Sequence, residues 1–318
     1  MAPATARKDL LWANLVHISF EMWWDRELPP GAERKYYEAR PHLRVDDALW
    51  NDILAGMHAA GMNMIVLDLG NGIAYESHPE IAVKNAWSTA RLRDELAECR
   101  ELGLEPIPKL NFSACHDVWL HPYDRMVSTP AYYAVCAELI AEVIELFDTP
   151  AFFHLGMDEE TAENQRLLRY AVIRQYDLWW HDLNQLIEAA QDGGSRPWVW
   201  SDHLWRHPDE FFANMPASVL QSNWYYDDNL NPEDPEVKAY AQLEEHRYDQ
   251  VPTASNFAGQ TRNLQKTVEL CTRVIHPDRL FGFMQTPWRP TQEEFRAIHM
   301  DAIEQVARAR AWYEGTRR

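Results

Sequence analysis

Short apolar runs alternate with longer stretches of helical periodicity along the whole chain. The short runs predict β-strands because they are rich in β-branched and aromatic residues and are bounded by Gly, Pro, Asn or Asp. Each run is followed by a stretch with apolar positions at helical spacing, which predicts one helix after every strand, eight in all. The predicted strands occupy residues 14–22, 63–70, 105–112, 151–158, 197–203, 218–226, 251–257 and 279–286.

The ends of the helices carry recognisable signals. Ser88 can cap a helix that stops at Gly103, and Pro130 suits the first turn of the next one. The fourth predicted helix, roughly 163–190, is the longest. Strict alternation of strands and helices implies parallel pairing through right-handed crossovers. The pattern therefore predicts an α/β protein, a single (β/α)8 TIM barrel over residues 1–318.

An open doubly wound sheet is the alternative architecture. Such a sheet commonly binds a nucleotide through a glycine-rich loop after one of its strands. Neither a GxGxxG nor a GxxxxGK[ST] loop follows any predicted strand. We therefore favour the closed barrel.

Polar side chains occupy the inward register of several predicted strands. Alternate residues of a strand point to opposite faces, so apolar Phe153 and Leu155 face the helices while His154 and Asp158 face the barrel interior. Unpaired buried charges are costly, and a terminal Asp that only caps a loop would not recur on strand after strand. The pattern predicts an active site at the C-terminal mouth. The other inward polar residues are His17, Ser19, Glu21, Asp68, Lys109, Asn111 and Asp202.

Composition narrows the range of partners. A net charge of -19 disfavours nucleic acid and anionic membranes and leaves a neutral small molecule open. The four cysteines form no CxxC pair, which argues against a zinc knuckle. No secretory signal or membrane-spanning run is present, so we expect a cytoplasmic location. A homodimer stays open as the quaternary state.

The sequence HLGMDEE, residues 154–160, resembles the H-x-G-x-D-E signature of glycoside hydrolase family 20, the β-N-acetylhexosaminidases. The match comprises His154, Gly156, Asp158 and Glu159 and falls on the fourth strand, where that family places it. The resemblance implies a retaining exo-glycosidase in which the 2-acetamido oxygen of the sugar attacks the anomeric carbon. Asp158 would stabilise the resulting oxazolinium ion, and Glu159 would protonate the leaving oxygen and then activate water. No cofactor is required.

Carbohydrate is therefore the expected partner, and further residues are candidates for binding it. The family surrounds the acetamido group with aromatic side chains, although core packing could explain each aromatic residue of this chain. Glu21 and Asp68 could accept sugar hydroxyls, while Lys109 is expected to pair with Asp68 or Asp158. The remaining candidates are Asn111, His116, His154, Trp200, Asp202, Trp224, Tyr225, Tyr226, Asp227 and Trp288.

The chain also departs from the family pattern. The family's first strand usually supplies an arginine for the outer sugar hydroxyls, whereas this one reads HISFEMWWDR and places Glu21 there. The identity of the terminal sugar is therefore open. One alternative is a divalent-metal-dependent sugar isomerase or hydrolase, although no HxH or HExxH spacing supports it. Its ligands would be His17, Glu21, Asp68, His154, Asp158 and Asp202. A non-catalytic sugar-binding barrel is the other alternative.

Overall fold

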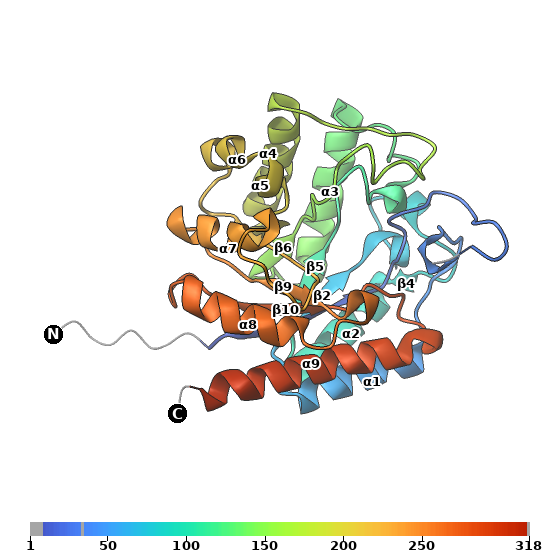
Figure 1. Cartoon of the computed structure of the whole chain (residues 1–318). Helices are drawn as coiled ribbons and strands as arrows, with labels where there is room; N and C mark the ends of the chain where they lie inside the picture. Colours follow the sequence, from blue (N-terminus) through green and yellow to red (C-terminus); the bar gives the residue numbers. More distant parts are fainter. Residues whose placement is uncertain (1–8, 33–34, 317–318) are drawn as a thin grey trace.

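A computed structural model describes residues 9–32 and 35–316, and its central feature is a sheet of eight parallel strands (Figure 1). The order across the sheet is β8-β7-β6-β5-β2-β1-β10-β9. These strands are β1 (Leu11–His17), β2 (Met64–Asp68), β5 (Glu105–Lys109), β6 (Phe152–His154), β7 (Arg196–Trp200), β8 (Leu220–Ser222), β9 (Thr253–Ser255) and β10 (Gly282–Thr286). Two further strands, β3 (Ile73–Ala74) and β4 (Trp87–Ser88), form a separate ribbon that is too short to show alternation in the sequence.

The two edges of the large sheet meet. Parallel bridges join Gln221 to Gln250 and Trp224 to Thr253, which connects β8 to β9. The backbone N–H of Thr253 also donates to the carbonyl of Asn223 at 2.9 Å. The sheet therefore closes on itself, and the predicted (β/α)8 barrel is confirmed.

Helices surround the barrel, and α9 lies beside α1 (Figure 1). The Ser88 hydroxyl accepts a hydrogen bond from the Arg91 backbone N–H at 3.1 Å, as the capping signal predicts. None of the described helices combines the length and apolar character needed to cross a bilayer. The α-helices are α1 (Asp47–Ala59), α2 (Thr89–Glu101), α3 (Pro130–Leu146), α4 (Asp177–Asp192), α5 (His203–Arg206), α6 (Pro208–Asn214), α7 (Pro235–Glu245), α8 (Asn263–Val274) and α9 (Arg296–Gly315).

All eight predicted strands have different bounds in the structure, and the fourth helix and the first strand show the differences that matter most for the site. The fourth helix starts at Asp177 rather than near 163, because the preceding segment forms a loop closed by two 2.7 Å bonds between the Gln165 side chain and the Val172 backbone. The first strand ends at His17, so Glu21 lies beyond it. The Glu21 carboxylate accepts hydrogen bonds from the Arg40 N–H and the Asn71 amide, each at 2.7 Å.

Two separate apolar clusters confirm the predicted strand register. One lies between the strands and the helices and contains Val16, Leu67 and Phe153. The other fills the barrel interior and contains Leu15 and Val66, neighbours of residues in the first cluster. Because neighbouring strand residues belong to different clusters, the polar residues in the inward register must lie inside the barrel or at its mouth.

Close backbone packing between β1 and β10 generates a stability prediction. Gly282 pairs with Leu11, and a Cβ at this position would lie 2.1 Å from the Leu11 carbonyl oxygen. Gly282→Ala should lower the free energy of unfolding by about 1–3 kcal/mol because the two strands must separate. Urea denaturation measures this change.

Gly315→Ala is the matched control. A Cβ at Gly315, at the end of α9, meets no other atom within 4 Å. This variant should equal the wild type or gain up to about 1 kcal/mol from helix propensity. Equal stability of Gly282→Ala and the wild type would contradict the packing argument.

Candidate active site

Asp158 and Glu159 lie in a tight turn directly after β6. Gly156, Met157 and Glu159 have φ values of +72°, +72° and +58°, a left-handed conformation that costs a non-glycine residue about 1–2 kcal/mol. Gly156 is required because a Cβ there would lie 2.1 Å from Asn111 Oδ1. Side chains that follow the neighbouring strands hold the turn: Asn111 Oδ1 accepts from the Met157 N–H at 3.2 Å, and Asp202 Oδ2 accepts from the Glu159 N–H at 2.8 Å.

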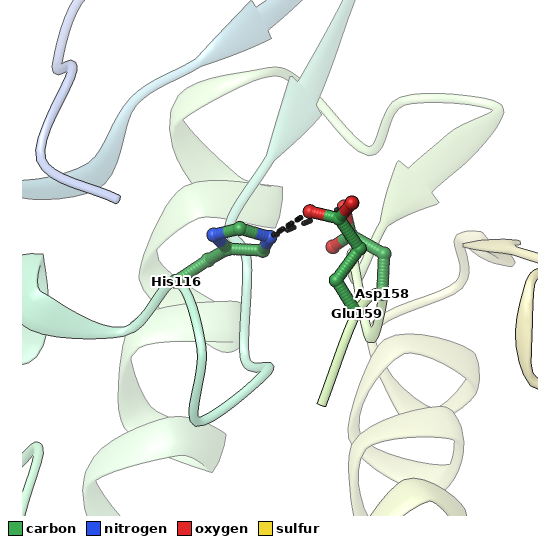
Figure 2. Close-up of side chains that lie close together, drawn as sticks. All are labelled: His116, Asp158 and Glu159. Carbon is green, nitrogen blue, oxygen red and sulfur yellow. Dashed lines mark hydrogen bonds and ion pairs between the residues drawn. The ribbon is translucent and has the colours of Figure 1, made fainter. Parts of the chain in front are cut away.

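The imidazole of His116 faces both candidate carboxylates (Figure 2). Its Nε2 atom lies 3.4 Å from Asp158 Oδ2 and 3.2 Å from Glu159 Oε2. The other oxygen of Asp158 accepts a 2.8 Å hydrogen bond from the Asn111 amide. Asp158 is only 5% exposed. Each of its two oxygens nevertheless has a polar partner, the Asn111 amide for one and the His116 imidazole for the other.

The surroundings move the pKa values of these three groups in different directions. Burial opposes ionisation of Asp158, but the charge and hydrogen bond of His116 outweigh it and lower the pKa of Asp158 to about 2. Burial also opposes protonation of His116, yet Asp158 and Glu159 raise the pKa of His116 to about 10. Burial raises the pKa of Glu159 despite its hydrogen bond to His116. Asp158 is therefore an anion at neutral pH, and Glu159 holds its proton more readily.

The third consecutive acid, Glu160, points away from this pair and has a structural role. It forms a buried ion pair with Arg174, and its Oε2 accepts from the Ala114 backbone N–H at 2.9 Å. Arg174 also pairs with Asp182 on α4 at 3.2 Å. Glu160 thereby ties the loop that carries His116 to the turn that carries Asp158 and Glu159. The run of three acids was the sequence signal for Glu160, whereas Arg174 lay in the segment predicted as helix.

Asp158, Glu159 and His116 line a cavity of about 520 Å3. Aromatic side chains form much of its wall, which suits the faces of a sugar ring. The wall includes the predicted residues Trp224, Tyr225, Tyr226, Asp227 and Trp288. It also includes residues absent from the predicted site. Trp23 lies in an irregular segment and Tyr37 ends a short 3-10 helix, and no periodic pattern in the sequence marks either residue. The full additional set is Met22, Trp23, Tyr37, Trp205, Glu236 and Phe257.

Several other predicted site residues support the barrel beneath the cavity. Lys109 is fully buried and donates to Asp68 Oδ2 at 2.5 Å, the ion pair expected from the sequence. Burial raises the pKa of Asp68 although the Lys109 charge opposes the shift. His154 is also fully buried, and its Nδ1 accepts from the Gly156 N–H at 3.1 Å. Lys109, Asp68 and His154 do not line the cavity. These three side chains therefore support the site from inside the barrel.

Trp200, Asp202 and Glu21 also lie outside this wall. Trp200 packs between His154 and Trp288, at ring-centroid distances of 4.5 and 6.0 Å. Its contact with Trp288 links the barrel interior to the cavity wall. Both carboxylate oxygens of Glu21 accept the hydrogen bonds described above, so this residue fixes the loop after β1.

The carboxylate pair and His116 also form a potential metal-binding group, since their ligand atoms lie within 4.8 Å of one another. A metal ligand must be a neutral imidazole, whereas the two acids raise the pKa of His116 and favour its protonated form. The ligands predicted from the sequence for a metal-dependent enzyme form a different set. Asp158 is the one residue that both sets contain. A proton on His116 and a bound cation are therefore alternatives at these three side chains, because each would place a positive charge between the imidazole and the carboxylates.

Several solved structures that share this fold are β-N-acetylhexosaminidases. The enzyme from Bacteroides fragilis NCTC 9343 superposes with a TM-score of 0.62 and 13% identity, over 96% of this chain and 71% of its own. The GH20 exo β-N-acetylglucosaminidase from Vibrio harveyi gives a TM-score of 0.64 and 11% identity, over 93% of this chain and 54% of its own. The chain shares the barrel fold of these enzymes.

A third solved structure agrees. The Streptomyces plicatus N-acetyl-β-hexosaminidase, in complex with Thio-NAglucal, has a TM-score of 0.62 and 12% identity, over 94% of this chain and 64% of its own. The chain thus spans less than two thirds of the length of two of these three structures. No protein-family profile matches the sequence, and no curated protein matches it.

The raised pKa of His116 predicts a dependence of stability on pH. The folded pKa of about 10 exceeds the ordinary value, so the protonated imidazole contributes stability that is fully present below pH ~6.5 and is lost as the pH rises through about 10. The free energy of unfolding of the wild type should therefore exceed that of His116→Gln at pH 7, and the difference should narrow towards pH 10. Urea denaturation across this range measures it.

His42→Gln serves as the control because His42 is exposed on the surface. Its difference from the wild type should stay small and constant over the same pH range. A His116→Gln difference that is also constant would show that the imidazole contributes packing rather than charge.

Proposed function

We propose that the protein is a retaining exo-glycosidase that removes a terminal N-acetylhexosamine, or a related sugar, by substrate-assisted catalysis. The observation that carries the proposal is the pair of adjacent carboxylates in one aromatic cavity, with the pKa of Asp158 lowered and that of Glu159 raised. Two acids with opposed pKa shifts suit one anionic and one proton-donating role. The shared fold with β-N-acetylhexosaminidases supports the same chemistry.

The cavity wall favours an uncharged sugar. Its described lining contains four acids, Asp158, Glu159, Asp227 and Glu236, against one cationic side chain, His116, and no Lys or Arg. A sugar that carries a carboxylate or a sulfate would be repelled there. Neutral hydroxyl and amide groups can instead donate hydrogen bonds to these acids, while the tryptophan faces contact the ring.

The first chemical step would use both acids. The acetamido oxygen attacks the anomeric carbon, the bond to the leaving oxygen breaks, and Glu159 donates its proton to that oxygen. The acetamido group becomes a positively charged oxazolinium ion, which the anionic Asp158 stabilises. His116 contributes by keeping Asp158 ionised. Asp158 is therefore charged before the reaction begins and needs no proton transfer.

The second step would use Glu159 in the opposite sense. Its carboxylate, formed in the first step, takes a proton from water as the water oxygen attacks the anomeric carbon. The bond between the acetamido oxygen and that carbon breaks, which restores the acetamido group. Two successive inversions at one carbon retain its configuration.

Replacement of the two acids should separate turnover from binding. Glu159→Gln should lower kcat for a phenyl β-N-acetylglucosaminide by roughly 10²–10⁴-fold because the leaving oxygen receives no proton. Asp158→Asn should lower it nearly as much because the oxazolinium ion loses its counter-charge. Steady-state kinetics measure turnover, and calorimetry with N-acetylglucosamine measures binding.

Glu163→Gln is the matched control, since Glu163 is exposed and lies four residues beyond Glu159. It should retain wild-type kinetics. Sugar binding without turnover by the wild type would favour a non-catalytic sugar-binding barrel over an enzyme.

The acetamido group itself is the subject of a further prediction. Aryl β-N-acetylglucosaminides should be hydrolysed at least ~10³-fold faster than aryl β-glucosides, because an internal nucleophile gains from its proximity. A thiazoline analogue of the oxazolinium ion should inhibit more tightly than the product sugar. Competition assays measure the ratio of the two hydrolysis rates and the inhibition by the thiazoline. A chelator in the assay removes divalent metal ions.

Equal rates for the two aryl substrates, together with no thiazoline inhibition, would contradict participation of the acetamido group. Loss of activity on adding the chelator, restored by magnesium or manganese, would instead support the metal-dependent alternative.

A further inference from the structure

Asp202 occupies a helix-capping position but does not cap its own helix. It directly precedes α5, and its side chain forms no capping bond to that helix. An Asp at this position ordinarily accepts a hydrogen bond from the second or third helical N–H. Here Oδ2 accepts instead from the backbone N–H of Glu159, at 2.8 Å. The carboxylate that follows β7 is thus directed at the turn that follows β6.

The backbone at Glu159 is one that needs such support. Its φ of +58° is left-handed, and a non-glycine residue stays in that region only when its surroundings determine it. The φ angle also sets the direction of the Cα–Cβ bond and hence the reach of the side chain. In this conformation the carboxylate meets His116 Nε2 at 3.2 Å. A change in backbone angle would move the proposed proton donor away from the cavity.

The other oxygen of Asp202 has no partner to explain its burial. Oδ1 is buried and has no hydrogen-bond partner among the described residues. Leaving a buried polar atom unpaired costs about 1–3 kcal/mol, which a purely structural residue would not need to bear. Burial, with smaller contributions from Asp158 and Glu159, raises the pKa of Asp202 to about 8. Asp202 therefore supplies an acceptor near neutral pH without adding a full third charge.

We propose that Asp202 is a positioning residue for Glu159, fixing the left-handed turn so that the Glu159 carboxyl group meets the leaving oxygen. This inference rests on the proposed function, because it assigns Asp202 a part in proton donation by Glu159. It differs from direct sugar binding in the aromatic cavity, whose lining does not include Asp202. Asp202 and Glu159 both line a second cavity, of about 530 Å3, so the two side chains are neighbours there as well.

The test compares leaving groups that need different amounts of protonation. The substrates are phenyl and 2,4-dinitrophenyl β-N-acetylglucosaminide, and the quantity is kcat/KM, which reports the first irreversible step. Asp202→Ala should lower kcat/KM about 100-fold for the phenyl substrate, the size expected for a misplaced catalytic group. For the dinitrophenyl substrate, whose leaving group departs unprotonated, the loss should stay within about threefold.

Two further variants sharpen the comparison. Asp202→Asn retains an oxygen that can accept the Glu159 N–H, so its kcat/KM should stay within about threefold of the wild-type value on both substrates. A larger loss would show that the charge of Asp202 is required. Asp202→Glu displaces the acceptor by one methylene and should reproduce the leaving-group dependence. It becomes the deciding variant if Asp202→Ala does not fold. Asp209→Ala, on the exposed surface of α6, should leave both values unchanged.

The outcomes separate the two proposals. Wild-type enzyme that hydrolyses neither substrate overturns the proposed function and, with it, this inference. Active wild-type enzyme whose Asp202→Ala and Asp202→Glu variants lose equal activity on both substrates overturns the inference alone. A thermal melting temperature close to that of the wild type shows that each variant is folded.

Discussion

Two buried carboxylates on adjacent residues repel each other and lose hydration, so the site depends on the cation placed between them. The imidazole of His116 lies within 3.4 Å of Asp158 and 3.2 Å of Glu159. Its charge lowers the pKa of Asp158, while burial raises that of Glu159. A single opposite charge thus divides two chemically similar acids into an anion and a proton donor. Without it, burial would favour the neutral form of both.

Three successive strands of the barrel contribute to this arrangement. The segment after β5 supplies Asn111 and His116, the turn after β6 supplies the acids, and Asp202 follows β7. A parallel barrel brings the C-terminal ends of its strands to one rim, so groups far apart in the chain become neighbours. The Glu160–Arg174 ion pair then joins the loops that lie above the rim. The polar groups beneath the cavity, such as Lys109 with Asp68, have partners of their own, which is why charge can be buried inside the barrel.

The sequence predicted the elements better than their ends. The apolar runs were sufficient to predict all eight strands of the barrel. Within a strand, side chains point alternately to the barrel interior and to the helices, so the two registers repeat every two residues. The first strand nevertheless ends at His17, and the segment before Asp177 is a loop despite its helical pattern. The local pattern of apolar residues cannot predict the hydrogen bonds that the Glu21 side chain accepts from Arg40 and Asn71. Side-chain bonds of this kind hold the segments beyond both elements, and a pattern of apolar positions does not encode them.

By itself the sequence determined the class of fold, the inward direction of the polar residues and the strand that carries the acid pair, since these follow from local periodicity and the order of elements. Only the tertiary structure decided which polar residues line the cavity and which pair with each other beneath it. It paired Glu160 with Arg174, selected Asp68 rather than Asp158 as the partner of Lys109, and directed Asp202 at the Glu159 backbone. The physical reason is that a side chain's partner depends on the loops of neighbouring strands, and their approach is set by the closure of the barrel.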